Sequence, residues 1–306
     1  MTRRIVVTGA RGFIGGHVTE YLRARGDDVR TVVVRTSHDE ASLRDTLLGA
    51  DALVHAAGVV SAIDPNQFVA GNVDVTRMVA AAAASAGARL VHISSLAAAG
   101  PAPRASPRRE SDPPAPITPY GLSKLEGERV VAGTEGLRWT ILRPGVVYGP
   151  RDRGLFPLFR YASRGLLPLV GPESTAYMFI QVTDVVKTIA AAIDANVDGE
   201  TMFVAHPTPV TPRELLSLIR EATNPRARIV PIPGTLLYAA SYAGQALGAL
   251  ARHPMPINRS RYAEFVSGGF VCSVDALRDR LGVVASMTLP QGIRGAAKWY
   301  REAGWL

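Results

Sequence analysis

A glycine-rich turn near the start of the chain constrains the fold more than any other feature. Residues 5–16 read IVVTGARGFIGG, so an apolar run leads directly into three glycines. In a turn from a strand to a helix, Gly9 permits the tight bend, Gly12 lets a phosphate approach the backbone, and Gly15 lets the helix pack on the sheet. The helix N-terminus then faces the phosphates. This placement predicts a nucleotide-binding α/β fold rather than an ordinary tight turn.

Apolar runs alternate with helical periods through the first half of the chain. The predicted strands are 5–8, 29–35, 52–55, 89–94 and 138–142, and the predicted helices are 13–25, 42–48, 69–86 and 120–131. This alternation predicts a doubly wound parallel sheet of the Rossmann type with helices on both faces. We expect the nucleotide-binding core to comprise residues 1–150, joined by 184–205, and a smaller substrate-binding lobe to comprise residues 151–183 and 206–306.

Composition limits the compartment and the partners. The 306 residues include one cysteine, Cys272, so an internal disulfide is excluded and we expect a cytoplasmic protein. The net charge of +8 comes without a basic stripe interleaved with aromatic residues, which argues against nucleic acid as a partner. The apolar stretch 236–250 is too short to span a membrane. We predict that it forms a packed helix, with a membrane-surface helix as the alternative.

Further motifs follow the glycine-rich turn in a fixed order. They are VHAAG at 54–58, HISSLAAAG at 92–100, PYGLSKLEGE at 119–128, LRPGVVYGPRD at 142–152 and FIQVTDVV at 179–186. Together these motifs resemble the extended short-chain dehydrogenase/reductase family, which includes epimerases, dehydratases and relatives of 3β-hydroxysteroid dehydrogenase. The resemblance covers nearly the whole chain and implies a nicotinamide-dependent enzyme, although it is much less specific for a substrate.

The proposed catalytic residues are Ser95, Tyr120 and Lys124. Tyr120 and Lys124 are four residues apart in a stretch that suits a helix, so they should lie one turn apart on one face. A free tyrosine has a pKa of about 10, and a nearby ammonium group lowers it, which lets the hydroxyl act as general acid or base. The resemblance implies that Ser95 orients the substrate oxygen and that Lys124 binds the nicotinamide ribose.

The resemblance also implies a set of cofactor contacts. These residues are Gly9, Arg11, Gly12, Phe13, Ile14, Gly15, Arg35, His55, Ala56, Ala57, Gly58, Asn72, Ser94, Tyr120, Lys124, Pro144 and Val146. Asn72 is expected to brace the site, and the rings of His55 and His92 are expected to lie in the core. Asp184 is expected to cap a helix. The sequence has no cluster of metal ligands.

Two arginines bear on the choice of cofactor. NAD-selective Rossmann proteins place an acidic residue at the end of the second strand, where this chain has Arg35. A guanidinium there suits a 2′-phosphate, and Arg11 precedes the second glycine of the turn. We therefore predict NADP(H), with NAD(H) as the alternative. Relatives carry a third strand whose terminal Asp contacts the adenine, but residues 35–51 lack that strand, and either Asp39 or Ser42 would have to substitute.

The residues beside the predicted catalytic residues help to distinguish between the activities found in this family. Leu96 and Ala97 follow Ser95 where dehydratases carry an Asp-Glu pair, so we reject dehydration. Val146 replaces the Asn of many epimerases and decarboxylases, which weakens that hypothesis. We predict interconversion of a ketone and a secondary alcohol, with a nucleotide-sugar epimerase or 4-ketoreductase as the alternative. A non-catalytic dinucleotide sensor is disfavoured because Tyr120 and Lys124 are intact. The resemblance further implies a small-molecule substrate and a homodimer.

Overall fold

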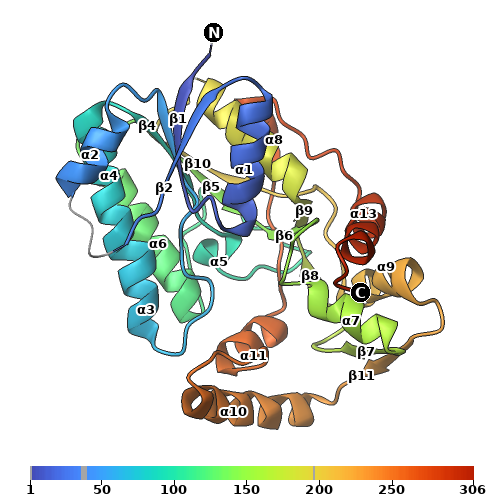
Figure 1. Ribbon diagram of the computed structural model, residues 1–306. Coiled ribbons are helices and arrows are strands. Elements are labelled where there is room, and N and C mark those ends of the chain that lie inside the picture. The colour runs from blue at the N-terminus through green and yellow to red at the C-terminus, as the bar shows by residue number, and fades with distance from the viewer. Residues whose placement is uncertain (1, 36–39, 196) are drawn as a thin grey trace.

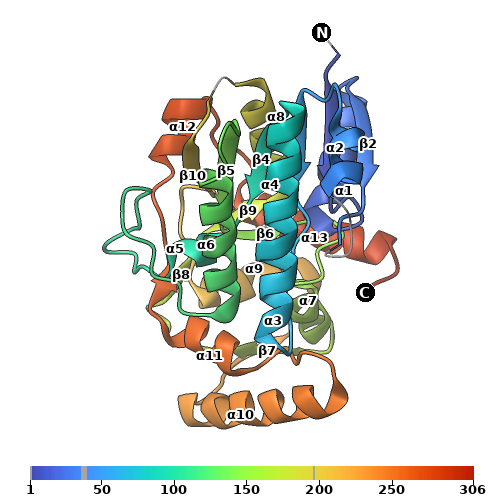
Figure 2. The ribbon, with the colours of Figure 1, turned by 90° about the vertical axis from the view of Figure 1, so that its left-hand side faces the viewer.

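A parallel six-stranded sheet forms the centre of the molecule. The computed structural model describes residues 2–35, 40–195 and 197–306. The strands are hydrogen-bonded in the order β10-β5-β4-β3-β1-β2, and helices cover both faces of the sheet (Figures 1 and 2). The sheet strands are β1 (Arg4–Thr8), β2 (Asp28–Val32), β3 (Ala52–His55), β4 (Arg89–Ile93), β5 (Trp139–Pro144) and β10 (Glu200–Val204). This arrangement confirms the Rossmann-type fold that the sequence predicts.

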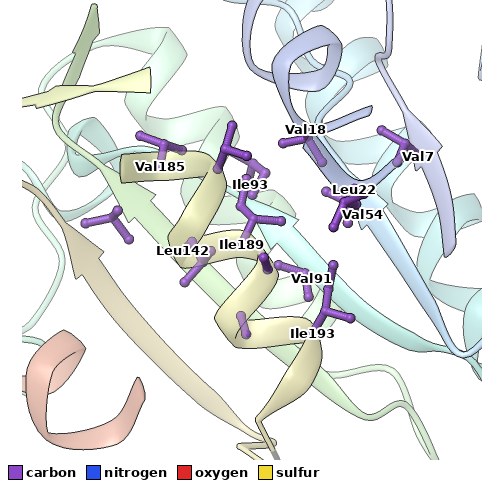
Figure 3. Close-up of a cluster of buried hydrophobic side chains, with 14 of the residues drawn as sticks. Val7, Val18, Leu22, Val54, Val91, Ile93, Leu142, Val185, Ile189 and Ile193 are labelled. Carbon is purple, nitrogen blue, oxygen red and sulfur yellow. The ribbon is translucent and has the colours of Figure 1, made fainter. Parts of the chain in front are cut away.

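Side chains of the sheet alternate between two apolar layers. Ile5 and Val7 of β1 face a buried cluster with α1 (Phe13–Ala24) and α8 (Val182–Asp194), part of which Figure 3 shows. Val6, between them, belongs to the cluster on the opposite face. Because both faces are covered, these strands are apolar at consecutive positions rather than at every second one. The helices of the opposite face are α2 (Glu40–Leu47), α4 (Val75–Ala86) and α6 (Pro119–Ala132).

A smaller lobe lies below the sheet in the view of Figure 1. Its buried core includes Phe159, Ile219 and Tyr300. Short parallel pairs connect it to the main sheet, since β6 (Val146–Tyr148) pairs with β9 (Phe179–Gln181). The remaining elements are α3 (Pro65–Val69), the π-helix η1 (Ala70–Asp74), α5 (Leu96–Ala99), α7 (Phe156–Ser163), β7 (Leu166–Leu169), β8 (Ala176–Tyr177), α9 (Pro212–Thr223), β11 (Arg228–Pro231), α10 (Gly234–Ala251), α11 (Arg259–Val266), β12 (Gly269–Phe270), α12 (Asp275–Leu281) and α13 (Leu289–Glu302).

The second strand is shorter than the sequence predicts. It ends at Val32 rather than at residue 35, because its single partner β1 ends at Thr8, where the chain turns into Gly9. The structure describes no strand in residues 40–51, so β2 forms the edge of the sheet. Of the two candidates for the adenine contact, Asp39 lies outside the described residues, and Ser42 lies on α2.

The apolar stretch 236–250 also differs from its prediction. It forms α10, but only Leu237, Ser241 and Gly248 of this helix are buried. The helix runs along the outer side of α11 at one end of the molecule (Figure 2), where no sheet is available to cover its remaining faces. The prediction of a packed helix is therefore wrong for most of its surface. None of the described helices is long and apolar enough to cross a membrane.

Candidate active site

The glycine-rich turn brings two loops of the sheet into backbone contact. Gly9 has a φ of 71°, and a side-chain carbon there would lie 2.6 Å from the backbone of Ala56. A side-chain carbon on Gly15 would lie 2.2 Å from the carbonyl oxygen of Gly9. Gly12 donates its backbone N–H to that same oxygen at 2.8 Å. Glycine is therefore required sterically at 9 and 15, which draws the loops after β1 and β3 together.

The same turn suits the pyrophosphate of a dinucleotide. Gly12 is the N-cap of α1 and provides no side-chain cap, and the first turn, which contains Phe13 and Ile14, has no acidic residue. The first N–H groups of a helix without a cap are available to an anion, and the helix dipole favours negative charge there. After β3, the N–H of Ala57 donates to the hydroxyl of Thr8 at 3.3 Å. The residues present thus fit a bound dinucleotide at this edge of the sheet.

Helix α6 places the predicted catalytic tyrosine beside the predicted serine. Thr118 caps the helix by accepting the N–H of Gly121 at 3.1 Å, so the helix begins just before Tyr120. A side-chain carbon on Gly121 would lie 2.5 Å from the carbonyl oxygen of Ala97, so α5 and α6 are in close contact. Ser95 caps α5, and its hydroxyl lies near enough to the Tyr120 hydroxyl to lower the pKa of that phenol. Hydroxyl groups from two separate elements are therefore neighbours.

The pKa of Tyr120 corrects one expectation. Burial raises the pKa of this half-buried side chain, and the nearby hydroxyl of Ser95 only partly offsets that effect. The charges of Arg261 and Glu264, both on α11, act on the same hydroxyl in opposite directions. Lys124 does not supply the expected lowering, since its Nζ donates to the carbonyl oxygen of Ile93 at 2.7 Å. The protein alone therefore favours the protonated tyrosine.

Lys124 is one turn from Tyr120 on α6 and is buried. Burial lowers the pKa of this ammonium to about 8, and the nearby carboxylate of Glu128 partly offsets the shift. A side-chain carbon on Gly58 would lie 3.8 Å from Nζ, so the loop after β3 passes close to the ammonium group. Lys124 thus lies between the dinucleotide-binding loops and the tyrosine.

A buried ion pair between Glu128 and Arg143 lies behind the site, and it was not predicted from the sequence. Glu128 lies one further turn along α6, and its carboxylate accepts two hydrogen bonds from the Arg143 guanidinium at 2.9 and 2.6 Å. The hydroxyl of Ser94 donates to the same carboxylate. Ser94, which was expected to lie against the cofactor, therefore uses its hydroxyl inside the protein. The spacing of 120, 124 and 128 along one helical face is the sequence signal that points to Glu128.

Asn72 has the bracing geometry expected of it. Its amide accepts the N–H of Val59 at 2.7 Å and donates to the carbonyl oxygen of that residue at 2.8 Å. The amide also donates to the hydroxyl of Ser123 at 2.9 Å. A side-chain carbon on Gly127 would lie 2.5 Å from the carbonyl oxygen of Asn72, so η1 and α6 are in close contact. These bonds hold the loop after β3 against the helix that carries Tyr120.

The other predicted cofactor residues lie along the same edge. Arg11 and Arg35 are both exposed, with Arg35 three residues beyond the end of β2. Pro144 ends β5, and Val146 begins β6 with 37% of its surface exposed. Ala56, Ala57 and Gly58 follow β3 directly. No group of three or more metal-ligating side chains occurs within the described part of the chain.

His55 and His92 lie in the core, on neighbouring strands, with their rings 5.3 Å apart. The ring nitrogens of His55 contact the hydroxyls of Thr8 at 2.7 Å and Thr76 at 3.2 Å. Neither ring nitrogen of His92 has a partner among the described residues. Burial, with the charge of Lys124, lowers the pKa of His55 to about 3 and the pKa of His92 well below its usual value. Both imidazoles are therefore neutral in the folded protein at neutral pH.

These two histidines predict a loss of stability in acid. Their folded pKa values are depressed, so between about pH 6 and pH 4 the unfolded chain binds protons that the folded chain excludes. The free energy of unfolding should fall by about 1.4 kcal/mol per pH unit for each imidazole. His92→Leu should remove one such contribution in urea unfolding measured across that range. His253→Leu, which removes an exposed imidazole, is the matched control. An unchanged slope for His92→Leu would contradict this prediction.

A cavity of about 670 Å³ lies beside the paired strands β6 and β9, between them and the N-terminal parts of α9 and α13. It is bounded by Tyr148 and Phe179 on the paired strands β6 and β9, and by Leu218 of α9. Its lining is mostly apolar, with Arg104 and Arg213 among the polar groups. Its walls thus include β6, which begins two residues after Pro144, whereas none of Ser95, Tyr120 and Lys124 lines it.

Comparison with known proteins identifies the family. Residues 5–205 match the family described as the NAD dependent epimerase/dehydratase family. The chain belongs to that family. The match spans the glycine-rich turn, the Ser95–Tyr120 pair and all six strands of the central sheet. The chain is therefore an NAD(P)-dependent enzyme of the extended short-chain dehydrogenase/reductase type, and its activity is that of an oxidoreductase or epimerase.

Individual relatives align over nearly the whole chain. The ceramide reductase of Caulobacter vibrioides is 27% identical over 321 residues, covering 99% of this chain and 96% of its own length. The sterol demethylase protein B of Methylococcus capsulatus is 28% identical, covering 98% of each chain. The structure of the UDP-glucose 4-epimerase of Thermus thermophilus in complex with NAD has a TM-score of 0.78 at 24% identity, covering 98% of this chain and 99% of its own. At this level of identity, the similarity to the epimerase structure shows a shared fold and nothing more.

Proposed function

We propose that this enzyme interconverts a ketone and a secondary alcohol with NADP(H), on a substrate that is largely apolar. The observation that carries the proposal is the placing of the Ser95 hydroxyl near the Tyr120 hydroxyl, with Lys124 one turn behind the tyrosine on α6. No carboxylate follows Ser95, where Leu96 and Ala97 stand, so no group is in place to eliminate water. This arrangement suits proton transfer to a carbonyl oxygen rather than dehydration.

The chain's own residues divide the work of reduction. A bound nicotinamide supplies the hydride at its C4 atom. Tyr120 donates its proton to the carbonyl oxygen, and Ser95 donates a second hydrogen bond to that oxygen. Burial keeps Tyr120 protonated until the oxygen gains charge, which suits an acid that must deliver its proton in the reaction step. Lys124, whose Nζ is fixed by the carbonyl oxygen of Ile93, holds the ribose of the cofactor. Solvent then returns a proton to Tyr120.

The proposed substrate class follows from the relatives and the cavity. The names of the two relatives described above, a ceramide reductase and a sterol demethylase protein, refer to apolar compounds. The mostly apolar cavity has the volume typical of small-molecule sites. We propose that the body of the substrate lies there, mostly against residues of the predicted substrate-binding lobe, 151–183 and 206–306. The second candidate is a nucleotide-sugar epimerase or 4-ketoreductase, and Arg104 and Arg213 in the cavity wall favour it because arginine suits phosphates.

A substrate panel separates the two candidates. Consumption of NADPH is measured with long-chain ketones, with steroid ketones, and with UDP- and dTDP-linked 4-ketosugars. We expect turnover with an apolar ketone and none with the nucleotide sugars. The product should be a secondary alcohol in amounts equal to the NADPH consumed. Turnover confined to the sugar nucleotides, or epimerisation without net consumption of NADPH, would establish the second candidate instead.

The preference for NADP(H) is tested at Arg35. Arg35→Asp should weaken NADPH binding at least about tenfold and leave NADH binding little changed, because a charged hydrogen bond to the 2′-phosphate contributes about 1.5–3 kcal/mol. Arg30→Asp is the matched control, since Arg30 is an exposed arginine on β2 of the same edge. Dissociation constants for both cofactors are measured by fluorescence titration. Equal losses for NADPH and NADH in Arg35→Asp would rule out the 2′-phosphate assignment.

A further inference from the structure

Helix α10 has an apolar surface that the protein does not cover. Its sequence, GTLLYAASYAGQALGALA, has no charged residue over 18 positions. Leu236, Leu247 and Leu250 are 57%, 54% and 84% exposed. With 3.6 residues per turn, these three leucines lie within about 60° of one another around the helix axis. An all-apolar helix is normally buried, and a contiguous exposed apolar surface marks an interaction site.

The covered side of the helix is narrow and made mainly of small residues. Leu237, Ser241 and Gly248 are buried, and they follow one stripe with Gly244. A side-chain carbon on Gly244 would lie 2.0 Å from the carbonyl oxygen of Ile257, so the loop after the helix is in backbone contact with this stripe. Tyr238 and Tyr242 pack beside α11, where their rings meet Tyr262 and Arg259. The three exposed leucines, Leu236, Leu247 and Leu250, form a ridge that lies outside all of these contacts.

The segment that contains the helix carries charge of one sign, although Arg261 at its end is paired with Glu264 at 3.0 Å. Residues 225–263 contain no Asp or Glu, and their basic residues are Arg226, Arg228, Arg252, His253, Arg259 and Arg261. Arg252 and His253 are exposed at the C-terminal end of the helix, and Arg228 is exposed on β11 just before it. An apolar ridge between basic ends complements an anionic lipid surface, where acyl chains accept the leucines and headgroups accept the cations. A second copy of the chain would instead bring like charges together.

We propose that α10 docks on the surface of an anionic lipid bilayer, with the leucine ridge of Leu236, Leu247 and Leu250 entering the interface. The helix lies in the plane of the membrane rather than across it, consistent with the lack of a spanning helix among the described elements. Docking would place α11, which packs on α10, between the bilayer and the rest of the protein (Figure 2). The proposal concerns location and does not depend on the reaction proposed above.

Vesicle flotation tests this docking. The whole protein is mixed with vesicles of phosphatidylcholine containing about 30% phosphatidylglycerol, or of phosphatidylcholine alone, at physiological salt. We expect binding to the anionic vesicles, weakening as salt is raised. The triple variant Leu236→Ser, Leu247→Ser, Leu250→Ser should lose about tenfold or more in partition coefficient. The matched control replaces the exposed residues Leu48, Leu166 and Val284 with serine and should change binding less than about twofold.

Folding and oligomeric state are measured alongside vesicle binding. Sedimentation velocity and circular dichroism are recorded on the same proteins, and the substituted leucines are exposed, so both triple variants should fold. Failure of the wild type to bind anionic vesicles would overturn the proposal, as would undiminished binding by the leucine variant. A wild-type dimer that dissociates in the leucine variant, with vesicle binding unchanged, would assign the ridge to self-association instead.

Discussion

Replacing Tyr120 with phenylalanine should lower turnover by about 10²- to 10⁴-fold, the range contributed by a positioned general acid. The substitution removes only the hydroxyl group, whose pKa the nearby Ser95 lowers. The ring keeps its packing, including its contact with the Phe68 ring at 6.0 Å between centroids. The dissociation constant for NADPH should therefore stay nearly unchanged. Stopped-flow measurement of a single turnover, together with a fluorescence titration of NADPH, separates the two effects.

Two companion variants sharpen the test of Tyr120. Ser95→Ala should slow the reaction less than Tyr120→Phe, because it removes a hydrogen bond but leaves the proton source. Tyr161→Phe, on an exposed tyrosine of α7, should leave turnover unchanged. Wild-type turnover in Tyr120→Phe would mean that another residue delivers the proton. Binding of NADPH by the wild type without turnover of any substrate tested would favour the dinucleotide-sensor hypothesis.

The features that the sequence predicts correctly depend on local spacing. The glycine-rich turn fixes a backbone geometry within a few residues, since Gly9 must adopt a positive φ and Gly15 must pack on it. The four-residue spacing of Tyr120 and Lys124 fixes one helical face in the same way. Alternation of apolar strands and helical periods then determines the layers. These patterns can be interpreted without knowing which distant segments of the chain contact each other.

Features set by distant contacts escape prediction from the sequence. Lys124 donates to the carbonyl oxygen of Ile93, and no local pattern indicates where the end of a long, flexible lysine side chain will lie. The Asp184 carboxylate accepts from the backbone of Ser286 and Met287, about a hundred residues away, while Gln181 caps α8 instead. The length of β2 likewise depends on where its partner β1 ends. Each of these outcomes is decided by tertiary packing.

The helix α10 was predicted correctly, but its burial was predicted wrongly, for a different reason. Apolar periodicity predicts that one face of a helix is shielded from water, but it does not indicate whether protein or lipid covers that face. Here the covered stripe along Leu237 and Gly248 is narrow, and the leucines outside it are exposed. The basic, acid-free segment on both sides of the helix is the sequence signal that would have favoured the membrane-surface alternative.

Gly12→Val should abolish cofactor binding in a protein that still folds. Gly12 is exposed at the N-cap of α1. A side-chain carbon added there would lie 3.1 Å from the carbonyl oxygen of Gly9, its nearest neighbour. A small backbone shift relieves that contact, so stability should change little. The isopropyl group would nevertheless occupy the space in front of the uncapped first turn of the helix, where the pyrophosphate is expected.

Two further glycines control for the general effects of the substitution. Gly295→Val introduces the same side chain at an exposed position of α13 with nothing within 4 Å, so both folding and NADPH binding should persist. Gly15→Val would drive a carbon to 2.2 Å from the carbonyl oxygen of Gly9 and should prevent folding. Thermal unfolding and NADPH titration on all three proteins distinguish loss of a site from loss of the fold. Wild-type affinity in folded Gly12→Val would mean that the pyrophosphate binds elsewhere, because the valine and the phosphates would compete for the same space at this turn.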